Sequence, residues 1–253
     1  MRDVERAFAL MDRIDEAVAE RVDPTPHGEL IVSTRLFNVY DENFLRVRDA
    51  GRATAAELAA EAEEAQAQYP AIRHRRVNVR DGGAAARLEP GFLELAWQPE
   101  RFVLMALRRK PAREPRAPVQ EVSAAELRAP WAEAGRSFGG SDELIRQMVE
   151  HHTAVGRALP TRYFAVEVAG RIAAYCELYS ADGVAQVENV VTLPEFRGRG
   201  FATSLVLHAT AESRAARNDL TFLVADADDW PRRLYERLGF EVAGRYARFL
   251  KPG

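Results

Sequence analysis

The sequence predicts a mixed α/β protein made of two α+β units, and its length, one proline-rich break and the order of its apolar patterns lead to this prediction. The chain has 253 residues, 47% of them hydrophobic, which at roughly 150 residues per domain corresponds to between one and two domains. Residues 111–118 combine three prolines with alternating charges and are the best candidate for a linker. We therefore predict a smaller N-terminal domain over residues 1–110 and a C-terminal domain over residues 119–253.

The charge balance and the cysteine content exclude several classes of protein. The chain has 35 Lys and Arg residues against 38 Asp and Glu residues, a formal net charge of −3 that argues against a nucleic-acid binder. Cys176 is the single cysteine, so neither an internal disulfide nor a cysteine-built metal cluster is expected. The longest apolar run, residues 102–107, is far shorter than the ~20 residues of a membrane helix. We expect a cytoplasmic protein with no metal and no membrane or nucleic-acid partner, either a monomer or a homodimer.

The N-terminal unit is predicted to combine two helices with several short strands. Apolar residues recur at every third or fourth position from Val4 to Val18, which predicts an amphipathic helix that ends before Pro24. The Ala- and Glu-rich residues 54–68 predict a second helix. Short apolar runs predict strands at residues 30–39, 44–47, 75–79, 92–97 and 102–107.

The C-terminal unit is predicted to begin with a short strand at residues 119–122 and a helical region over residues 124–152. Tight turns at Gly170 and at residues 181–183 separate strands and predict an antiparallel meander. The meander strands are predicted at residues 162–168, 172–179 and 184–193. They are followed by a helix at 200–216, a strand at 221–225, a helix at 231–238 and a strand pair at 241–250.

The most informative segment joins the last meander strand to the following helix. Residues 190–202 read VVTLPEFRGRGFA, so an apolar strand stops at Pro194 and a glycine-interrupted turn leads into a helix. Such a turn places backbone N–H groups at the positive end of the helix, which favours a phosphate or diphosphate. Gly198 and Gly200 permit positive φ angles, and Arg197 and Arg199 add positive charge. Taken alone, the same pattern also describes an ordinary strand-to-helix connection.

Two signatures in this half resemble those of the GNAT (Gcn5-related) N-acetyltransferase family. The loop pattern Arg/Gln-x-x-Gly-x-Gly/Ala is matched by Arg197, Gly200 and Ala202. Further along, residues 234–240 read LYERLGF and resemble the second signature, Leu-Tyr-Glu-x-Leu-Gly-Phe. The resemblance covers residues 119–253 and implies a GNAT fold there, with acetyl-CoA as co-substrate.

The resemblance also implies how acetyl-CoA is bound. The backbone of the strand before the loop, at Val191 and Leu193, is expected to pair with the pantetheine arm. Asp228 stands where the family frequently has an asparagine that contacts the pantetheine; an ionised aspartate accepts hydrogen bonds but cannot donate them. The diphosphate is expected to be held by the amides of Arg197, Gly198, Arg199, Gly200, Phe201 and Ala202.

Tyr235 and Glu188 are the candidate catalytic residues. Acyl transfer to an amine needs a base for the ammonium proton and benefits from an acid for the departing thiolate. The resemblance implies that Tyr235 is the acid and that Glu188 is the base, directly or through water. The alternatives are a packed core tyrosine and a strand glutamate in a salt bridge or in solvent. Regular alternation along the strand predicts that Glu188 faces away from Val191 and Leu193.

Other polar residues have secondary roles in this interpretation. Glu177 and Tyr179 share one face of the neighbouring strand and are candidates for recognition of the amine. His151 and His152 are expected at the surface and not as metal ligands, and Cys176 is expected to be a small buried residue.

The predicted function is transfer of an acetyl group from acetyl-CoA to a primary amine of a small molecule, or of a peptide, in a ternary complex. The alternative is a non-catalytic acyl-CoA-binding protein that acts as a sensor or an assembly partner. The N-terminal unit has no Gly-x-Gly loop and is interpreted as a degenerate acetyltransferase-like half that closes one wall of the acceptor site. A recognition module or a stabilising partner are the other interpretations.

Overall fold

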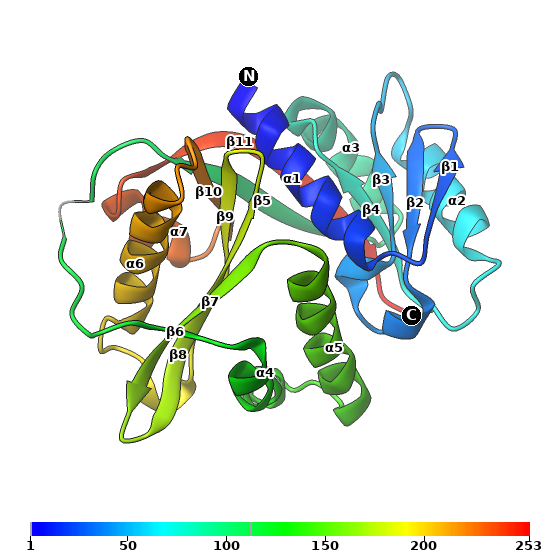
Figure 1. Ribbon diagram of the computed structural model, residues 1–253. Coiled ribbons are helices and arrows are strands. Elements are labelled where there is room, and N and C mark those ends of the chain that lie inside the picture. The colour runs from blue at the N-terminus through cyan, green and yellow to red at the C-terminus, as the bar shows by residue number, and fades with distance from the viewer. Residues whose placement is uncertain (1, 112) are drawn as a thin grey trace.

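The computed structural model describes residues 2–111 and 113–253 (Figure 1). In these residues one continuous 11-stranded sheet runs in the order β1-β2-β3-β4-β11-β5-β10-β9-β8-β7-β6, with both parallel and antiparallel pairs. This confirms the predicted mixed α/β class.

Within the described residues, the first half of the chain contains three α-helices where two were expected. Asp81 begins α3 by accepting a hydrogen bond from the Ala84 amide, and Ala85, Leu88 and Phe92 are buried at helical spacing. The strand predicted at residues 92–97 is therefore wrong, because this apolar run is the end of a helix and a turn. The predicted strand at 30–39 ends at Val32. The elements are α1 (Arg2–Val18), β1 (Arg21–Thr25), β2 (Gly28–Val32), η1 (Thr34–Leu36), η2 (Tyr40–Glu42), β3 (Phe44–Val47), α2 (Ala55–Gln66), β4 (Arg75–Val79), α3 (Gly82–Glu94) and β5 (Gln98–Leu107).

The second half follows the predicted order more closely. The expected strand pair at residues 241–250 is one long strand. Its pairing with β5 shifts register between Val242 and Gly244 without ending the strand. The elements are β6 (Gln120–Val122), α4 (Ala124–Ser137), α5 (Asp142–Ala158), β7 (Thr161–Val168), β8 (Arg171–Ala181), β9 (Val184–Thr192), η3 (Pro194–Phe196), α6 (Phe201–Ala215), β10 (Leu220–Asp226), α7 (Pro231–Arg237) and β11 (Phe240–Lys251).

The two halves repeat one order of elements and exchange their last strands. Strands β1, β2 and β3 are antiparallel neighbours and β4 is parallel to β3, just as β7, β8 and β9 are antiparallel and β10 is parallel to β9. The last strand of the first half, β5, pairs with β10, whereas the last strand of the second half, β11, pairs with β4 and β5. The predicted domain limits remain a prediction, since both halves contribute to one sheet. Residue 112 of the predicted linker lies outside the described residues, and the rest of residues 111–118 forms no helix or strand.

Helices cover the two faces of the sheet in separate groups. On β5, Leu104 and Ala106 pack with residues of α1 and α5, while Val103 and Met105 pack with residues of α6 and α7. We call the first side the α1/α5 face. Figure 1 shows α1 lying across the strands where the two halves meet.

Strands β9 and β10 pair only at their beginnings. Leu220, Thr221 and Phe222 pair with residues 184–186, and no pairing between these strands follows in the described chain. Asn189 has a φ of +51°, and the register between β8 and β9 shifts at the same place. The edge of β9 that faces β10 is therefore open from Val187 onward.

Candidate functional site

The larger of two cavities along β9 lies at the N-terminus of α6 and has a volume of about 740 Å³. None of the residues that line it, within the described chain, is acidic. Guanidinium groups are well suited to phosphate recognition. We call it the arginine cavity because five arginines line it: Arg113, Arg116, Arg197, Arg199 and Arg237.

The N-terminus of α6 is open to this cavity. Gly200 occupies the N-cap position with a φ of +79°, and no side chain caps the first amides of the helix. These amides lie at the positive end of the helix and are available to an anion. A Cβ at residue 200 would lie 3.0 Å from Cδ of Arg116. Glycine therefore also permits the close approach of the segment between β5 and β6, which contains Arg116.

The predicted loop residues gather here, and two other predicted residues do not. Residues 197–202 all line the arginine cavity, as does Val191. Leu193 is buried, and its N–H donates to the carbonyl of Ala173 at 3.0 Å. This hydrogen bond holds the start of the turn between β9 and α6 against β8. The side chain of Asp228 is 75% exposed and lies 3.5 Å from Arg101 rather than in the cavity.

Several residues of the arginine cavity were missed by the sequence analysis. Arg113 and Arg116 come from the segment between β5 and β6, which Figure 1 shows running past α6. The amides of Arg116 and Ala117 donate to Oγ of Ser204 on α6, which holds this segment in place. The alternating charges of the predicted linker include both of these arginines, but nothing in the neighbouring sequence indicates that they lie at α6.

The second cavity has a volume of about 360 Å³ and lies on the α1/α5 face between the two halves of the chain. We call it the central cavity. Its lining passes along β9 at Gln186, Glu188 and Asn189, directly before the residues Val190 and Val191 that line the arginine cavity. Its other polar lining residues are Asp15, Asp41, Glu42, Asn78, Arg80, His151, His152, Tyr179, Asp226, Tyr246 and Arg248.

Two glutamates stand opposite each other on β8 and β9; Glu188 lines this cavity, and Glu177 lies behind lining residues that it contacts. Glu177 is fully buried and accepts hydrogen bonds from Tyr179 and from Nδ2 of Asn189 at 2.7 Å, while Nδ1 of His152 lies 3.1 Å away. Burial acts to raise the pKa of Glu177, but His152 and these hydrogen bonds outweigh it and lower the pKa below its ordinary value. Burial and the neighbouring Glu177 raise the pKa of Glu188, whose carboxylate accepts a hydrogen bond from the Gln186 side chain.

The irregularity of β9 corrects one expectation about Glu188. Glu188 lies opposite Glu177 and Val191 lies opposite Tyr175, two positions apart on the regular strand β8. Residues that are directly opposite in a sheet share a face. Glu188 and Val191 therefore point to the same side, because the extra residue at Asn189 cancels the alternation that predicted opposite sides.

Tyr235 lies in α7 near these groups and lines neither cavity. It is 8% exposed and packs edge-on against Phe240. Burial raises its pKa most, and the charge of Glu188 raises it further, which keeps the phenol protonated. Cys176 is fully buried, as expected, and burial raises the pKa of its thiol.

The expectation that His151 and His152 lie at the surface is wrong. Both line the central cavity, because α5 packs against α1 and places its second half over β8 and β9. Nδ1 of His151 lies 2.8 Å from the buried Glu42, and although burial opposes the charged imidazolium, this carboxylate raises the pKa of His151 to about 9. His152 stacks on Trp131.

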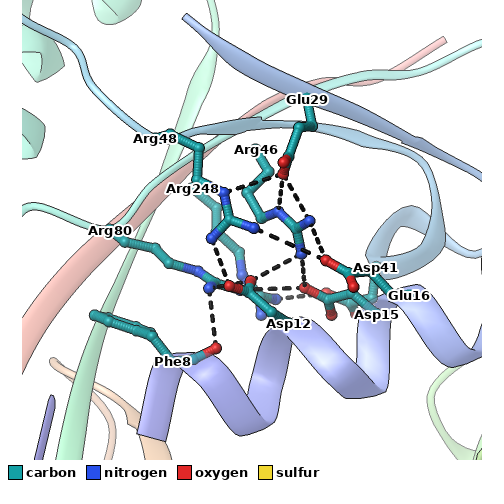
Figure 2. Close-up of polar contacts among 10 residues, drawn as sticks. All are labelled: Phe8, Asp12, Asp15, Glu16, Glu29, Asp41, Arg46, Arg48, Arg80 and Arg248. Carbon is teal, nitrogen blue, oxygen red and sulfur yellow. Dashed lines mark hydrogen bonds and ion pairs between the residues drawn. The ribbon is translucent and has the colours of Figure 1, made fainter. Parts of the chain in front are cut away.

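A network of ion pairs links α1 to the sheet beside the central cavity (Figure 2). Arg46 is fully buried and contacts carboxylates of α1 and β2. Nη2 of Arg80 lies 3.1 Å from Asp15, and Arg248 bonds to Asp41. The residues of the network are Asp12, Asp15, Glu16, Glu29, Asp41, Arg46, Arg48, Arg80 and Arg248.

Two further properties concern metals and membranes. The described residues contain no group of three or more His, Cys, Asp or Glu side chains that could hold a metal ion. In the same residues no helix has the length and apolar character to cross a membrane.

Solved structures share this fold over almost the whole chain. A functionally unknown conserved protein from Staphylococcus epidermidis matches with a TM-score of 0.73 at 14% identity, covering 93% of this chain and 94% of that one. A GCN5-related N-acetyltransferase from Kribbella flavida matches with a TM-score of 0.66 at 20% identity, covering 99% and 96%. A tandem GNAT protein from the clavulanic acid biosynthesis pathway matches with a TM-score of 0.53 at 15% identity, covering 99% and 95%.

At these identities the structural matches establish the fold alone. A search of curated proteins found no match. The model of the acetyltransferase (GNAT) family matches residues 125–240, which include the open N-terminus of α6, the splayed strands and α7. Residues 125–240 of this chain therefore form a domain of the acetyltransferase (GNAT) family.

Proposed function

We propose that the protein transfers an acetyl group from acetyl-CoA to a primary amine of a small molecule, by direct transfer in a ternary complex. The family and the fold support acyl transfer in general. The observation that carries the finer proposal is that two chemically different cavities are lined by consecutive residues of β9, one by Val190 and the other by Asn189. One is suited to a diphosphate and the other to a cation.

The arginine cavity is the proposed site for CoA. Five arginines and the uncapped amides of α6 supply the positive potential that a diphosphate needs. The open edge of β9 at Val190 and Val191 can pair with the amides of the pantetheine arm. This arrangement directs the thioester along β9 toward Glu188.

Glu188 and Tyr235 are proposed to move the protons of the reaction. The ammonium group first loses one proton to Glu188, directly or through water, and Glu188 releases this proton to solvent. The amine nitrogen then forms a bond to the acetyl carbonyl carbon, its second proton passes to Glu188, and the carbon–sulfur bond breaks. Tyr235 donates a proton to the departing sulfur and is reprotonated from solvent as Glu188 gives up its second proton. The raised pKa of Glu188 brings it closer to neutrality, which improves a carboxylate as a general base.

The first half of the chain is proposed to close the acceptor site. Met11, Asp41 and Asn78 line the central cavity opposite Glu188 and Tyr179 of the second half. The repeated element order supports its interpretation as a degenerate acetyltransferase-like half.

The test measures CoA binding and amine-dependent thiol release separately. We expect Tyr235→Phe to lower kcat by about 10²-fold or more, the contribution typical of a general acid, with CoA affinity unchanged in calorimetry. Glu188→Gln should lower kcat by a similar factor. Tyr69→Phe, whose hydroxyl bonds to Asp23 in the first half, is the control and should keep full activity.

Two results would contradict the proposal. Absence of CoA binding would remove the assignment of the arginine cavity. Tight CoA binding with no thiol release from any pool of primary amines would favour a non-catalytic sensor or assembly protein.

A further inference from the structure

Seven buried polar side-chain atoms of residues that line the central cavity have no hydrogen-bond partner among the described residues. Three of them belong to residues in carboxylate–imidazole ion pairs, namely Glu42, His151 and His152. The other four belong to no such pair. They are Oδ1 of Asn78, Oε1 of Gln186, the hydroxyl of Tyr246 and Nε of Arg248. Tyr246, Asn78 and Gln186 are 3%, 6% and 4% exposed. A buried polar group without a partner costs on the order of 1–3 kcal/mol, so such a concentration at one cavity indicates a place for polar groups of a ligand.

Three of these side chains form one wall. Tyr246 and Arg248 are two positions apart on β11, and Asn78 on β4 lies directly opposite Arg248. The guanidinium of Arg248 lies 4.7 Å from the ring centre of Phe102 and 5.7 Å from that of Tyr246. This wall faces the cavity from the first half and from β11, whereas Glu188 faces it from β9.

The charged groups near this wall already compensate one another. Arg248 bonds to Asp41, which also accepts from Arg76 at 3.0 Å, and Arg76 contacts Glu100 in turn. Arg80 is paired with Asp12 and Asp15, and His151 with Glu42. A second charged group on a ligand, of either sign, would disturb this balance in a buried region.

On the β9 side of the cavity, Glu188 forms no ion pair with a described residue. The one side-chain hydrogen bond that Glu188 makes within the described chain comes from a neutral amide, that of Gln186. Glu177 lies opposite it and is itself paired with His152. The cavity lining also contains the apolar side chains of Met11, Ile14, Val39, Phe44, Phe102, Met148 and Val224.

We infer, resting on the proposed function, that the acceptor is a small primary amine with one positive charge, an apolar body and a neutral hydrogen-bonding group at the end remote from the amine. The ammonium group lies at Glu188. The remote carbonyl, amide or hydroxyl accepts from Tyr246 and from Nε of Arg248, and an N–H or O–H of it donates to Asn78. The volume of about 360 Å³ limits the acceptor to a compact molecule.

A set of probes with one carbon skeleton tests this inference. Hexylamine, 6-aminohexanol, 6-aminohexanamide, 6-aminohexanoate and 1,6-hexanediamine differ only at the remote end, so the reacting amine is nearly the same in each. We expect kcat/KM for the amide or the alcohol to exceed that of hexylamine by about tenfold, because a polar group replaces water at unpartnered atoms. The carboxylate and the diamine should be poorer than hexylamine.

The variant Tyr246→Phe provides the second measurement. It should reduce several-fold the ratio of kcat/KM for 6-aminohexanamide to kcat/KM for hexylamine, whatever its effect on the rate with each probe. An unchanged ratio, or a preference of the wild-type protein for the carboxylate or the diamine, would overturn the inference. If the variant does not fold, the comparison of probes with the wild-type protein is sufficient to test the inference.

Direct binding separates this inference from the proposed function. Calorimetry in the presence of CoA measures the affinity of each probe without turnover. Tighter binding of the amide than of the carboxylate, with no thiol release, would support the assigned ligand class and contradict acetyl transfer. Turnover of all five probes at one rate would support acetyl transfer and contradict the assigned ligand class.

Discussion

Asp15 and Asp41 show how the same residue type acquires opposite properties a short distance apart. Asp41 lies between Arg76 and Arg248, and their charges outweigh burial and lower its pKa. Asp15 faces Arg80 and Arg46, but burial together with the nearby negative charges outweighs these arginines and raises its pKa to about 7. Asp15 is therefore a partly buried group, with a side chain that is 20% exposed, and it loses its proton near neutrality.

This difference predicts a pH dependence of stability. Between its ordinary pKa of 3.8 and about 7, Asp15 holds its proton in the folded chain and has lost it in the unfolded chain. The folded state then binds more protons, so the free energy of unfolding falls as the pH rises through this window. The variant Asp15→Asn has no titrating carboxyl group at this position, so its free energy of unfolding does not fall for this reason. We expect the difference in Tm, variant minus wild type, to increase by about 5–10 °C from pH 5 to pH 8, which corresponds to ~2.6 kcal/mol.

Thermal unfolding at the two pH values measures this effect. Glu5→Gln is the matched control, since Glu5 is exposed on the same helix. A Tm difference for Asp15→Asn that does not change with pH would show that Asp15 titrates normally.

Single residues were predictable where their role depends on nearby sequence. Residues 197–202 were located because a loop that binds through its own backbone needs glycines at fixed local spacing. His151 and Arg116 were not, because their roles depend on α5 packing over β9 and on Ser204 holding the segment before β6. Neither contact leaves a pattern in the neighbouring sequence.

At the scale of elements, the helices α2 and α6 occupy equivalent places in the two halves but begin differently. Before α2, residues 48–53 read RDAGRA and fit the same loop spacing as residues 197–202, which the sequence analysis overlooked. There, Thr54 caps the helix by accepting from the Glu57 amide, and Arg87 donates to the carbonyls of Gly51 and Ala53. The Thr54 side chain thus occupies an amide of the kind that α6 leaves open, and Arg87 contacts the carbonyls of the loop before the helix. This supports the prediction that the first half does not bind CoA in this way.

The open N-terminus of α6 leads to a prediction at the same scale. Gly200→Ala should weaken CoA binding by about tenfold or more, because a Cβ is disfavoured at φ +79° by ~1–2 kcal/mol and would press on Arg116. Gly170→Ala is the control. Its φ is +77° in the β7–β8 turn, and a Cβ there meets nothing within 4 Å.

Calorimetric titration of CoA into both variants distinguishes the loop from general strain. Both should lose a similar amount of stability, and only Gly200→Ala should lose affinity. Equal affinities would contradict the assigned diphosphate site.

At the scale of the whole molecule, the exchange of β5 and β11 makes the two halves interdependent. Each of these strands pairs with a strand of the other half, and β11 pairs along most of its length with β5. The halves therefore share hydrogen bonds across the centre of the sheet and not only a packed surface.

A cut between the halves should therefore leave them together. With a protease site inserted between Arg113 and Arg116, in the segment that forms no helix or strand, we expect the cleaved fragments to co-elute in native gel filtration and to unfold in one transition. Separation of the fragments without denaturant would show that the halves are independent domains. The uncut protein with the same insertion is the control.

The sequence indicated the fold class and the family but not this exchange. Turns at Gly170 and at residues 181–183 made the meander readable, because hairpins are local. The position of β11 between β4 and β5 depends on pairing between residues such as Phe249 and Val77, which are far apart in the chain. The run at residues 92–97 was misassigned because a short apolar run fits a buried helix end and a strand equally well.

The placement of β11 has a consequence for biosynthesis. When the first half leaves the ribosome, β4 has an unsatisfied edge, and its partner β11 is synthesised after the other ten strands of this sheet. Exposed strand edges favour pairing with other chains. The sheet therefore closes only after β11 has been synthesised, and we expect translation products that stop before β11 to be prone to aggregation.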